Sequence, residues 1–229
     1  MPTNALAAAI FDMDGLLIDS EPLWQEAEIS CLRPLGVPLT RDICRAQAGR
    51  RLDEVLRDWQ QQFGWDGPDL NEMHGRIISE VTRLILENGT ALPGVHETIA
   101  DLRQAGLKIA IASSSPHSLI DAVVAKLELE PLLDLTHSGT DETRGKPDPG
   151  IFLTTARRLG VSPARCLVFE DAPAGVTAAH RAGMKVIAVP SVVNPDHPSF
   201  RVAEQTLKSL LDFRLTNFLP PSGSFNLEP

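Results

Sequence analysis

The sequence Phe11-Asp12-Met13-Asp14-Gly15 directly follows the apolar run Leu6-Ala7-Ala8-Ala9-Ile10, and the two together decide the fold. A short apolar run of this kind predicts a buried strand. Alternate residues of a strand point to the same side, so Asp12 and Asp14 can face one pocket, and Gly15 lets the chain turn away from it. Such a carboxylate pair favours a phosphoryl-transfer site, in which one group attacks and the other moves protons.

The composition indicates a folded protein that does not bind polyanions. The chain has 229 residues, 43% of them hydrophobic. This length allows one large domain, or a core of about 150 residues with a smaller insertion. The 21 basic and 30 acidic residues give a formal net charge of −9. Because this charge repels a nucleic-acid backbone and no dense Lys/Arg run offsets it, we expect no nucleic-acid partner.

The cysteines and the N-terminus indicate a soluble protein of a reducing compartment. Cys31, Cys44 and Cys166 are odd in number, far apart and without a Cys/His metal spacing, so neither a disulfide framework nor a zinc site is predicted. The first residues carry no basic leader, and two aspartates interrupt the first apolar run, which argues against a signal peptide or a membrane span. We therefore expect a cytoplasmic protein without a membrane partner.

A helical region follows the first strand. Apolar residues recur there at three- and four-residue spacing, which is typical of amphipathic helices in a small bundle. The apolar sets are Trp24, Ala27, Ile29, Cys31 and Leu35, then Leu52, Val55, Leu56 and Trp59, and then Met73, Ile77, Val81, Leu84 and Ile85. Core packing is the expected role of each set.

From Leu92 onward, strands and helices alternate. The predicted strands are 107–112, 132–137, 166–169 and 185–189, and the predicted helices are 95–104, 119–127, 150–159 and 174–182. Units of this length predict an α/β fold with a doubly wound parallel sheet that is covered on both faces. We expect a core domain at residues 1–17 and 93–215, an inserted helical domain at 18–92 and a flexible tail at 216–229.

Three further polar clusters are expected near Asp12, because ligands of such sheets bind outside the carboxyl ends of the strands. They are Ser113-Ser114-Ser115, Glu170-Asp171, and Lys146 in a proline-rich loop. Each has an ordinary alternative, since the serines and the acidic pair can cap helices and a lone lysine can be solvated surface. Their joint placement favours a site that contains a nucleophile, hydroxyl donors, a cation and oxygen ligands for a metal.

Four segments resemble the four motifs of the haloacid dehalogenase superfamily. They are Asp12-Met13-Asp14-Gly15-Leu16-Leu17-Ile18-Asp19-Ser20, the Ser113 segment, Gly145-Lys146-Pro147 and Phe169-Glu170-Asp171-Ala172-Pro173-Ala174-Gly175. The helical insertion is similar to the α-helical cap of the beta-phosphoglucomutase-like branch. Within that branch, the segment from Leu16 to Trp24 looks most like bacterial phosphatases of 2-deoxyglucose 6-phosphate or hexitol phosphates. The resemblance implies a Rossmann-like core with the cap inserted after its first strand.

The resemblance implies a two-step hydrolysis of a small sugar or polyol phosphate monoester. Asp12 would form an aspartyl-phosphate, and Asp14 would protonate the leaving oxygen and later deprotonate the attacking water. Ser113, the backbone amide of Ser114 and Lys146 would hold the transferring phosphoryl group.

The resemblance also implies Mg²⁺ as the cofactor. The phosphate ester and the attacking aspartate are both anionic, so their approach needs a cation. Oxygen ligands from Asp12, Asp171 and the backbone carbonyl of Asp14 would suit this ion. Glu170 would contact these ligands instead of the ion.

The cap would close over the site and contact the leaving group. The loop Gln47-Ala48-Gly49-Arg50-Arg51 resembles the specificity loop of the family, so Arg50 or Arg51 would contact sugar hydroxyls, with surface solvation as an equal alternative. Trp24 either stacks on the sugar or packs between cap helices, and packing is favoured. His117 either lines the pocket or is a surface residue at a helix start, and the surface interpretation is favoured.

Two other functions compete with hydrolysis. A mutase would return the phosphoryl group to a second sugar hydroxyl, but the mutases resembled here carry a histidine in the cap hinge where this chain has Trp24, whose indole is no acid or base near neutral pH. An inactive sugar-phosphate-binding regulator would be expected to lack Asp12, Asp14 or Lys146, and all three are present. Hydrolysis by a monomer, with a small phosphate ester as the partner, is therefore preferred.

Overall fold

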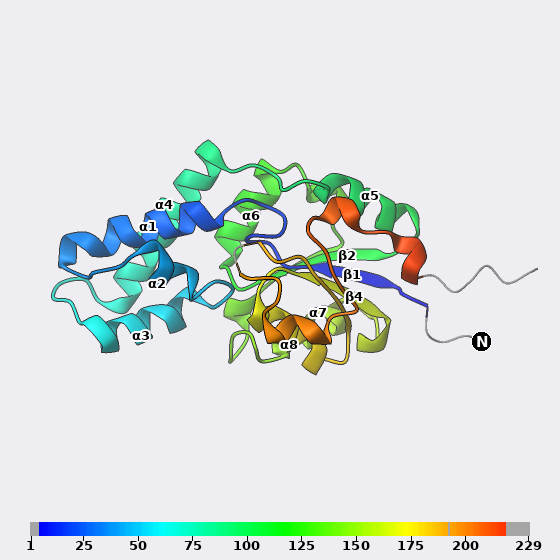
Figure 1. Cartoon of the computed structure of the whole chain (residues 1–229). Helices are drawn as coiled ribbons and strands as arrows, with labels where there is room; N and C mark the ends of the chain where they lie inside the picture. The colour runs from blue at the N-terminus through cyan, green and yellow to red at the C-terminus, as the bar shows by residue number, and fades with distance from the viewer. Residues whose placement is uncertain (1–4, 192, 219–229) are drawn as a thin grey trace, which may run out of the picture.

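A six-stranded parallel sheet lies at the centre of the computed structural model, which describes residues 5–191 and 193–218 (Figure 1). Its strand order is β3-β2-β1-β4-β5-β6. The strands are β1 (Ala8–Phe11), β2 (Lys108–Ser113), β3 (Leu135–Ser138), β4 (Cys166–Glu170), β5 (Lys185–Ala188) and β6 (Gln205–Thr206). Because β1 pairs with both β2 and β4, the carboxyl end of β1 lies between the carboxyl ends of these two strands.

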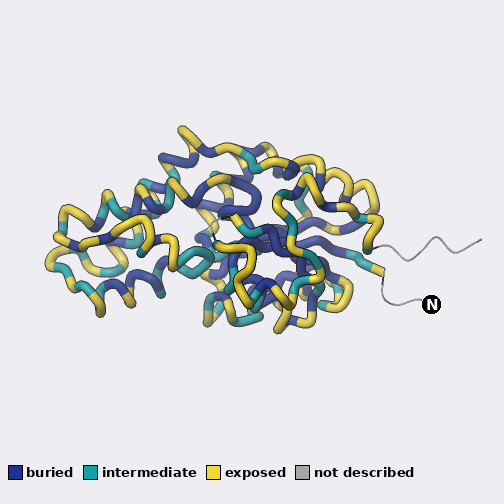
Figure 2. The backbone as a smooth tube through the Cα atoms, in the orientation of Figure 1, coloured by how far each residue is buried: buried dark blue, intermediate teal, exposed yellow. Residues whose placement is uncertain are grey.

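Helices cover both faces of the sheet, and the strands between them are buried (Figure 2). Ala9 and Phe11 of β1 belong to the same apolar cluster as α5 (Val95–Gln104) and α6 (His117–Lys126). Ala8 and Ile10 belong to the cluster of α7 (Gly150–Leu159) and α8 (Pro173–Arg181). This alternation of neighbouring residues between two clusters confirms the doubly wound α/β fold.

The helical insertion lies to one side of the sheet (Figure 1). It contains α1 (Glu21–Leu32), α2 (Arg41–Arg45), α3 (Leu52–Phe63) and α4 (Leu70–Asn88). The apolar sets predicted for α3 and α4 are buried in full. The set predicted for α1 also packs against the core, although only Ala27 of this set is fully buried. The helix buries three polar residues as well, Glu21, Gln25 and Glu28.

Two chain connections join the insertion to the sheet, and they lie side by side. The amide of Asp19 donates to the carbonyl of Thr90 at 3.0 Å, and the amide of Leu92 donates to the carbonyl of Leu17 at 3.1 Å. Adjacent crossings of this kind let an inserted domain move about one axis. The exact domain bounds, 18 and 92, stay a prediction.

Short 3₁₀ helices complete the described chain. They are η1 (Arg33–Leu35), η2 (Glu130–Leu132), η3 (Gly139–Asp141), η4 (Pro163–Arg165), η5 (Pro198–Val202), η6 (Leu210–Asp212) and η7 (Leu215–Phe218). The tail predicted from residue 216 is wrong for residues 216–218, because they belong to η7 and the ring of Phe218 stacks on that of Phe213 at a centroid distance of 5.8 Å. Residues 219–229 lie outside the described residues. None of the described helices has the length and apolar character that crossing a membrane requires.

We expect Gly94→Ala to destabilise the fold more than Gly106→Ala. Both glycines have positive φ, +90° and +83°, so alanine costs roughly 1–2 kcal/mol at either position. Only at position 94 would the added Cβ meet backbone, 2.7 Å from the carbonyl carbon of Leu210, and such overpacking adds about 1–3 kcal/mol. Urea unfolding of both variants measures the difference, and equal losses would contradict it.

Candidate active site

The carboxyl ends of β1, β2 and β4 bring three predicted site residues to one place. Asp12 directly follows β1, and its amide donates to the carbonyl of Phe169 at 3.0 Å, which extends the pairing of β1 with β4. Ser113 is the last residue of β2 and Glu170 the last residue of β4. Asp12, Ser113 and Glu170 are all buried. Because adjacent parallel strands end at the same edge of the sheet, these side chains converge there.

Lys146 supplies the buried cation of this group. Its ammonium nitrogen donates to Asp12 Oδ1 at 2.5 Å, to Glu170 Oε1 at 2.5 Å and to the carbonyl of Ala112 at 3.2 Å. The ring centroid of Phe152 lies 5.1 Å from the same nitrogen. Three acceptors and an aromatic face replace the water that the ammonium group loses on burial, so the charge is retained in the interior.

The charges around Lys146 do not balance. Burial alone would lower the pKa of Lys146, but the charges of Asp12 and Glu170 outweigh burial and raise this pKa. Burial raises the pKa of Asp12 to about 7, against the lowering effect of Lys146. Burial, followed by the charges of Asp12 and Glu170, raises the pKa of Asp171 well above its usual range. One cation faces three carboxyl groups, so a second cation would stabilise their ionised forms.

The carboxylate of Asp171 indicates where a second cation fits. Its Oδ2 accepts a hydrogen bond from Ser191 at 2.7 Å, whereas its Oδ1 is buried with no partner among the described residues. Carboxylate oxygens of Asp12, Glu170 and Asp171 lie within 4.8 Å of one another. An orphaned buried oxygen is costly unless an ion or a proton meets it. The residues present therefore fit a hard divalent cation that takes oxygen ligands.

Two glycines leave the space that these carboxylates occupy. Gly15 has φ of +77°, as the predicted turn requires, and a Cβ there would lie 2.5 Å from Asp171 Oδ2. Gly175 lies in the first turn of α8, and a Cβ there would overlap the carboxylate of Glu170. A side chain at either position would displace an acidic group of the site.

Asp14 accepts hydrogen bonds from uncharged donors. Its Oδ1 accepts from the hydroxyl of Ser20 at 2.7 Å and from the indole N–H of Trp24 at 2.8 Å, and its Oδ2 accepts from the hydroxyl of Ser115 at 2.7 Å. Trp24 lies on α1, so this carboxylate connects the core to the first helix of the cap. Trp24 also packs against the apolar core. The expected packing role is present, and the hydrogen bond to Asp14 is a second role that the sequence did not reveal.

The predicted specificity loop lies directly against the core. The carbonyl of Gly49 accepts from the Ser114 hydroxyl at 3.0 Å. The backbone of Gly49 has φ of +78°, and a Cβ there would lie 2.6 Å from the Cβ of Ala172. Arg50 lines the cavity between cap and core, as expected, but its guanidinium pairs with Asp58 at 2.8 Å. The loop approaches the core this closely because position 49 has no side chain.

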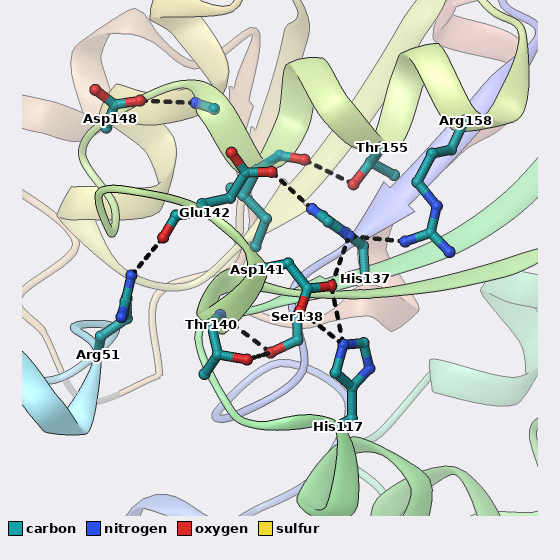
Figure 3. Close-up of polar contacts among 12 residues, drawn as sticks. Arg51, His117, His137, Ser138, Thr140, Asp141, Glu142, Asp148, Thr155 and Arg158 are labelled. Atoms are coloured by element: carbon teal, nitrogen blue, oxygen red, sulfur yellow. Dashed lines mark hydrogen bonds and ion pairs between the residues drawn. The ribbon is translucent and has the colours of Figure 1, made fainter.

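Arg51 contacts the core instead of the cavity. Its guanidinium donates to the carbonyl of Glu142 at 2.8 Å (Figure 3). Beside it, Glu54 of α3 accepts from the amide of Gly145 at 3.0 Å. Both contacts hold the loop that ends at Lys146. Arg51 and Glu54 thus form a clamp between the cap and this loop, and a contact of Arg51 with sugar hydroxyls stays a prediction.

Figure 3 also shows what holds the clamped loop from the core side. The buried His137 lies between Arg158, which donates to Nδ1 at 2.8 Å, and Glu142, whose Oε1 lies 2.8 Å from Nε2. Since Nδ1 accepts, Nε2 carries the proton and donates to Glu142. His117 is exposed at the start of α6, and its Nε2 lies 2.9 Å from Asp141 Oδ2. It is not among the residues that line the cavity, which agrees with the favoured interpretation of a surface residue.

The cavity between cap and core has a volume of about 50 Å³. Asp12, Asp14 and the serines at positions 113–115 form its core side. Since one water needs about 10–15 Å³ of such space, the cavity holds only a few waters. A sugar phosphate is larger, so this arrangement of cap and core leaves no room for one.

Helix α1 contributes a polar row to the cap side of this cavity, which the sequence did not reveal. Glu21, Gln25 and Glu28 of α1 line it, together with Cys44 of α2. The signal was a polar set at positions i, i+4 and i+7, which places three side chains on one face of a helix. Such a set usually marks a solvated helix face. Only the fold shows that this face is buried and lines a cavity.

Comparisons with known proteins agree with this geometry. A family model described as haloacid dehalogenase-like hydrolase matches residues 6–183. Hexitol phosphatase B of Escherichia coli (strain K12) is 36% identical over 215 residues, which cover 93% of this chain and 97% of that protein. Validoxylamine A 7'-phosphate phosphatase of Streptomyces hygroscopicus subsp. limoneus is 31% identical over 212 residues, which cover 93% and 98%.

The solved structures agree on the fold. A beta-phosphoglucomutase from Clostridium difficile superposes with a TM-score of 0.81 at 22% identity, covering 93% of this chain and 95% of that one. Both phosphatase relatives match along almost their whole length. Since the family match spans most of the chain and its four motifs meet at one edge of the sheet, the chain belongs to the haloacid dehalogenase-like hydrolase family.

Proposed function

We propose that the chain is a Mg²⁺-dependent phosphatase that hydrolyses sugar or polyol phosphate monoesters through an aspartyl-phosphate on Asp12. The observation that carries this proposal is the buried group of Lys146 with Asp12, Glu170 and Asp171, which has one cation for three carboxyl groups. Two relatives that match along almost their whole length carry the names hexitol phosphatase B and validoxylamine A 7'-phosphate phosphatase.

Asp12 is the proposed nucleophile. Its Oδ1 is held by Lys146, so the carboxylate has a fixed direction toward the cavity that it lines. Attack on phosphorus releases the alcohol and leaves an acyl phosphate, which water then hydrolyses. Lys146 stabilises the charge that gathers on the phosphoryl oxygens, and Ser113 and Ser114 contribute hydrogen-bond donors from the end of β2.

Asp14 is the proposed acid and base. It lines the same cavity as Asp12, and three donors from Ser20, Trp24 and Ser115 fix its orientation. It donates a proton to the departing alcohol oxygen in the first step and takes a proton from the attacking water in the second. Because Ser20 and Trp24 accompany the cap, cap closure brings Asp14 into this orientation.

Mg²⁺ is the proposed cofactor, held by Asp12, Asp171 and the backbone carbonyl of Asp14. When bound, the ion neutralises the carboxylates and polarises the phosphate. Glu170 stays with Lys146, because its Oε1 accepts from the ammonium group and its Oε2 from the amide of Ala172 at 3.2 Å.

The mutase alternative has less support. A mutase must hold a second phosphate in the cap, but Arg50, the cation of the cap loop that lines the cavity, is already paired with Asp58. Trp24 donates its indole N–H to Asp14 and provides no acid or base for a second transfer. Hydrolysis needs neither a second phosphate site in the cap nor an acid or base at position 24.

The cellular setting is also a proposal. Cys31, Cys44 and Cys166 are all unpaired, which fits a reducing cytoplasm. The active site is complete within one chain, which fits a monomer.

We expect Asp12→Asn to abolish phosphate release from sugar phosphates, with a loss of at least about 10³-fold, because an amide is not a nucleophile. The matched control is Asp101→Asn, which makes the same change at an exposed position of α5. Initial rates of phosphate release with Mg²⁺ measure both. Retained activity in Asp12→Asn would overturn the proposed mechanism.

We expect Mg²⁺ to raise the Tm of the wild type and to have little effect on Asp171→Asn. At 100 times its Kd, a bound ion stabilises the folded state by about 2.7 kcal/mol. Without Mg²⁺, Asp171→Asn should be at least as stable as the wild type, because the amide removes a buried carboxylate with an orphaned oxygen. Thermal unfolding with EDTA and with Mg²⁺ tests this, with the exposed Asp196→Asn as the control. An equal Mg²⁺ shift in all three proteins would exclude Asp171 as a ligand.

We expect Arg51→Met to lower kcat about tenfold with a smaller change in KM, because the loop before Lys146 loses its contact with the closed cap. Arg57→Met is the control, since Arg57 lies on α3, the helix that Arg51 precedes, but pairs only at the surface. Steady-state kinetics on one sugar phosphate separate the two constants. A rise in KM alone would instead return Arg51 to the substrate-binding role expected from the sequence.

A further inference from the structure

One face of α1 buries three polar side chains where the fold would gain from apolar ones. Glu21, Gln25 and Glu28 are 8%, 4% and 7% exposed. They occupy positions i, i+4 and i+7 and therefore form a row along the helix that spans about 10 Å. Glu26, on the other side of the same helix, is exposed. Burial of polar groups costs free energy unless hydrogen bonds compensate for it, so this row needs a reason.

The protein itself provides few partners for this row. Among the described residues, no hydrogen bond reaches the carboxyl group of Glu21. Gln25 receives only a long contact from Arg41 at 3.5 Å. The Cys44 thiol lowers the pKa of Glu28 and thereby offsets part of the effect of burial. All three residues line the cavity that contains Asp12 and Asp14. Their free hydrogen-bonding capacity is therefore available to a molecule in that cavity.

The chemistry of the row suits hydroxyl groups. Burial, assisted by the charge of Asp14, raises the pKa of Glu21 to about 7, and burial raises the pKa of Glu28 to about 8. A carboxyl group near its pKa can donate as well as accept, and the Gln25 amide does both. A hydroxyl group also does both, so each can pair with a hydroxyl in either direction.

The same row offers an anionic leaving group no countercharge. Glu21, Glu28 and Asp14 face the cavity, and the guanidinium of Arg50 is already paired with Asp58. A leaving group with a carboxylate or a second phosphate would meet these acidic groups without a free cation from the cap loop.

We propose that the Glu21, Gln25 and Glu28 face of α1 binds the hydroxyl groups of the leaving group and selects neutral polyhydroxylated phosphate monoesters against esters with an acidic leaving group. This inference rests on the proposed phosphatase function and adds the residues that recognise the leaving group and the esters that they reject. The row lies in the cap, so substrate hydroxyls can pair with it while the phosphoryl group contacts the core.

The test compares three esters: a hexitol phosphate, p-nitrophenyl phosphate, which has no hydroxyl, and phosphoglycolate, which has a carboxylate. We expect the wild type to prefer the hexitol phosphate over phosphoglycolate by at least about 100-fold in kcat/KM, since a site built for hydroxyls rejects analogues without them. Equal or better turnover of phosphoglycolate would overturn the inference.

The variants Gln25→Met and Glu28→Met keep the side-chain volume and remove the hydrogen bonds. Each should lower the ratio of kcat/KM for the hexitol phosphate over that for p-nitrophenyl phosphate by about tenfold, the effect of one lost hydrogen bond. Neither should lower the Tm, because a buried apolar group replaces a poorly paired polar one. Glu26→Met is the matched control and should leave the ratio unchanged. Unchanged ratios in Gln25→Met and Glu28→Met, or a lower Tm with an unchanged ratio, would assign the row a structural role and overturn the inference.

Binding separates this inference from the proposed function. Calorimetry on Asp12→Asn with Mg²⁺ measures the Kd of the hexitol phosphate and of phosphoglycolate without turnover. Tighter binding of the hexitol phosphate, lost in the double variant with Glu28→Met, supports the inference even if the wild type hydrolyses no ester. Equal binding of the two ligands overturns the inference even if the wild type is an active phosphatase.

Discussion

The burial of the Lys146 ammonium group is the constraint on which the site depends. A buried cation needs fixed acceptors, and Asp12 and Glu170 provide them from the ends of two adjacent strands. Those strands are adjacent because β1 lies between β2 and β4. Gly175 keeps the first turn of α8 clear of Glu170, so the ion pair forms without displacement of the helix. The sheet order and one glycine thereby determine the position of Asp12, the proposed nucleophile.

The cap contributes to the same arrangement from the opposite side. Trp24 and Ser20 orient Asp14, and Arg51 and Glu54 hold the loop that carries Lys146. Each contact crosses from the cap to the core. In this arrangement the cap thus fixes Asp14, the proposed acid, and the loop that carries Lys146, besides excluding water from the site.

The sequence predicted the fold and the centre of the site because both follow from local patterns. The bounds of α5 and α7 agree with the predicted helices, since Gly106 and Gly160 end those patterns. Asp12, Ser113 and Asp171 converge because each comes shortly after a predicted strand. Lys146 reaches them from the loop between β3 and α7. The sequence could not predict that Arg51 reaches Glu142, which lies 91 residues away, and the two-residue strand β6 has no periodicity to detect. Glu21, Gln25 and Glu28 were missed because a polar helix face looks solvated until its neighbours are known.

The most direct test of the central claim is to trap the covalent intermediate during turnover. The protein with Mg²⁺ and a sugar phosphate would be quenched with acid and reduced with borohydride, which converts an aspartyl-phosphate to homoserine, and the peptides would then be sequenced by mass spectrometry. The account predicts homoserine at position 12 in the sample with substrate and none in the sample without it. Active turnover with no homoserine at position 12, or with homoserine at position 14 or 171, would contradict Asp12 as the nucleophile.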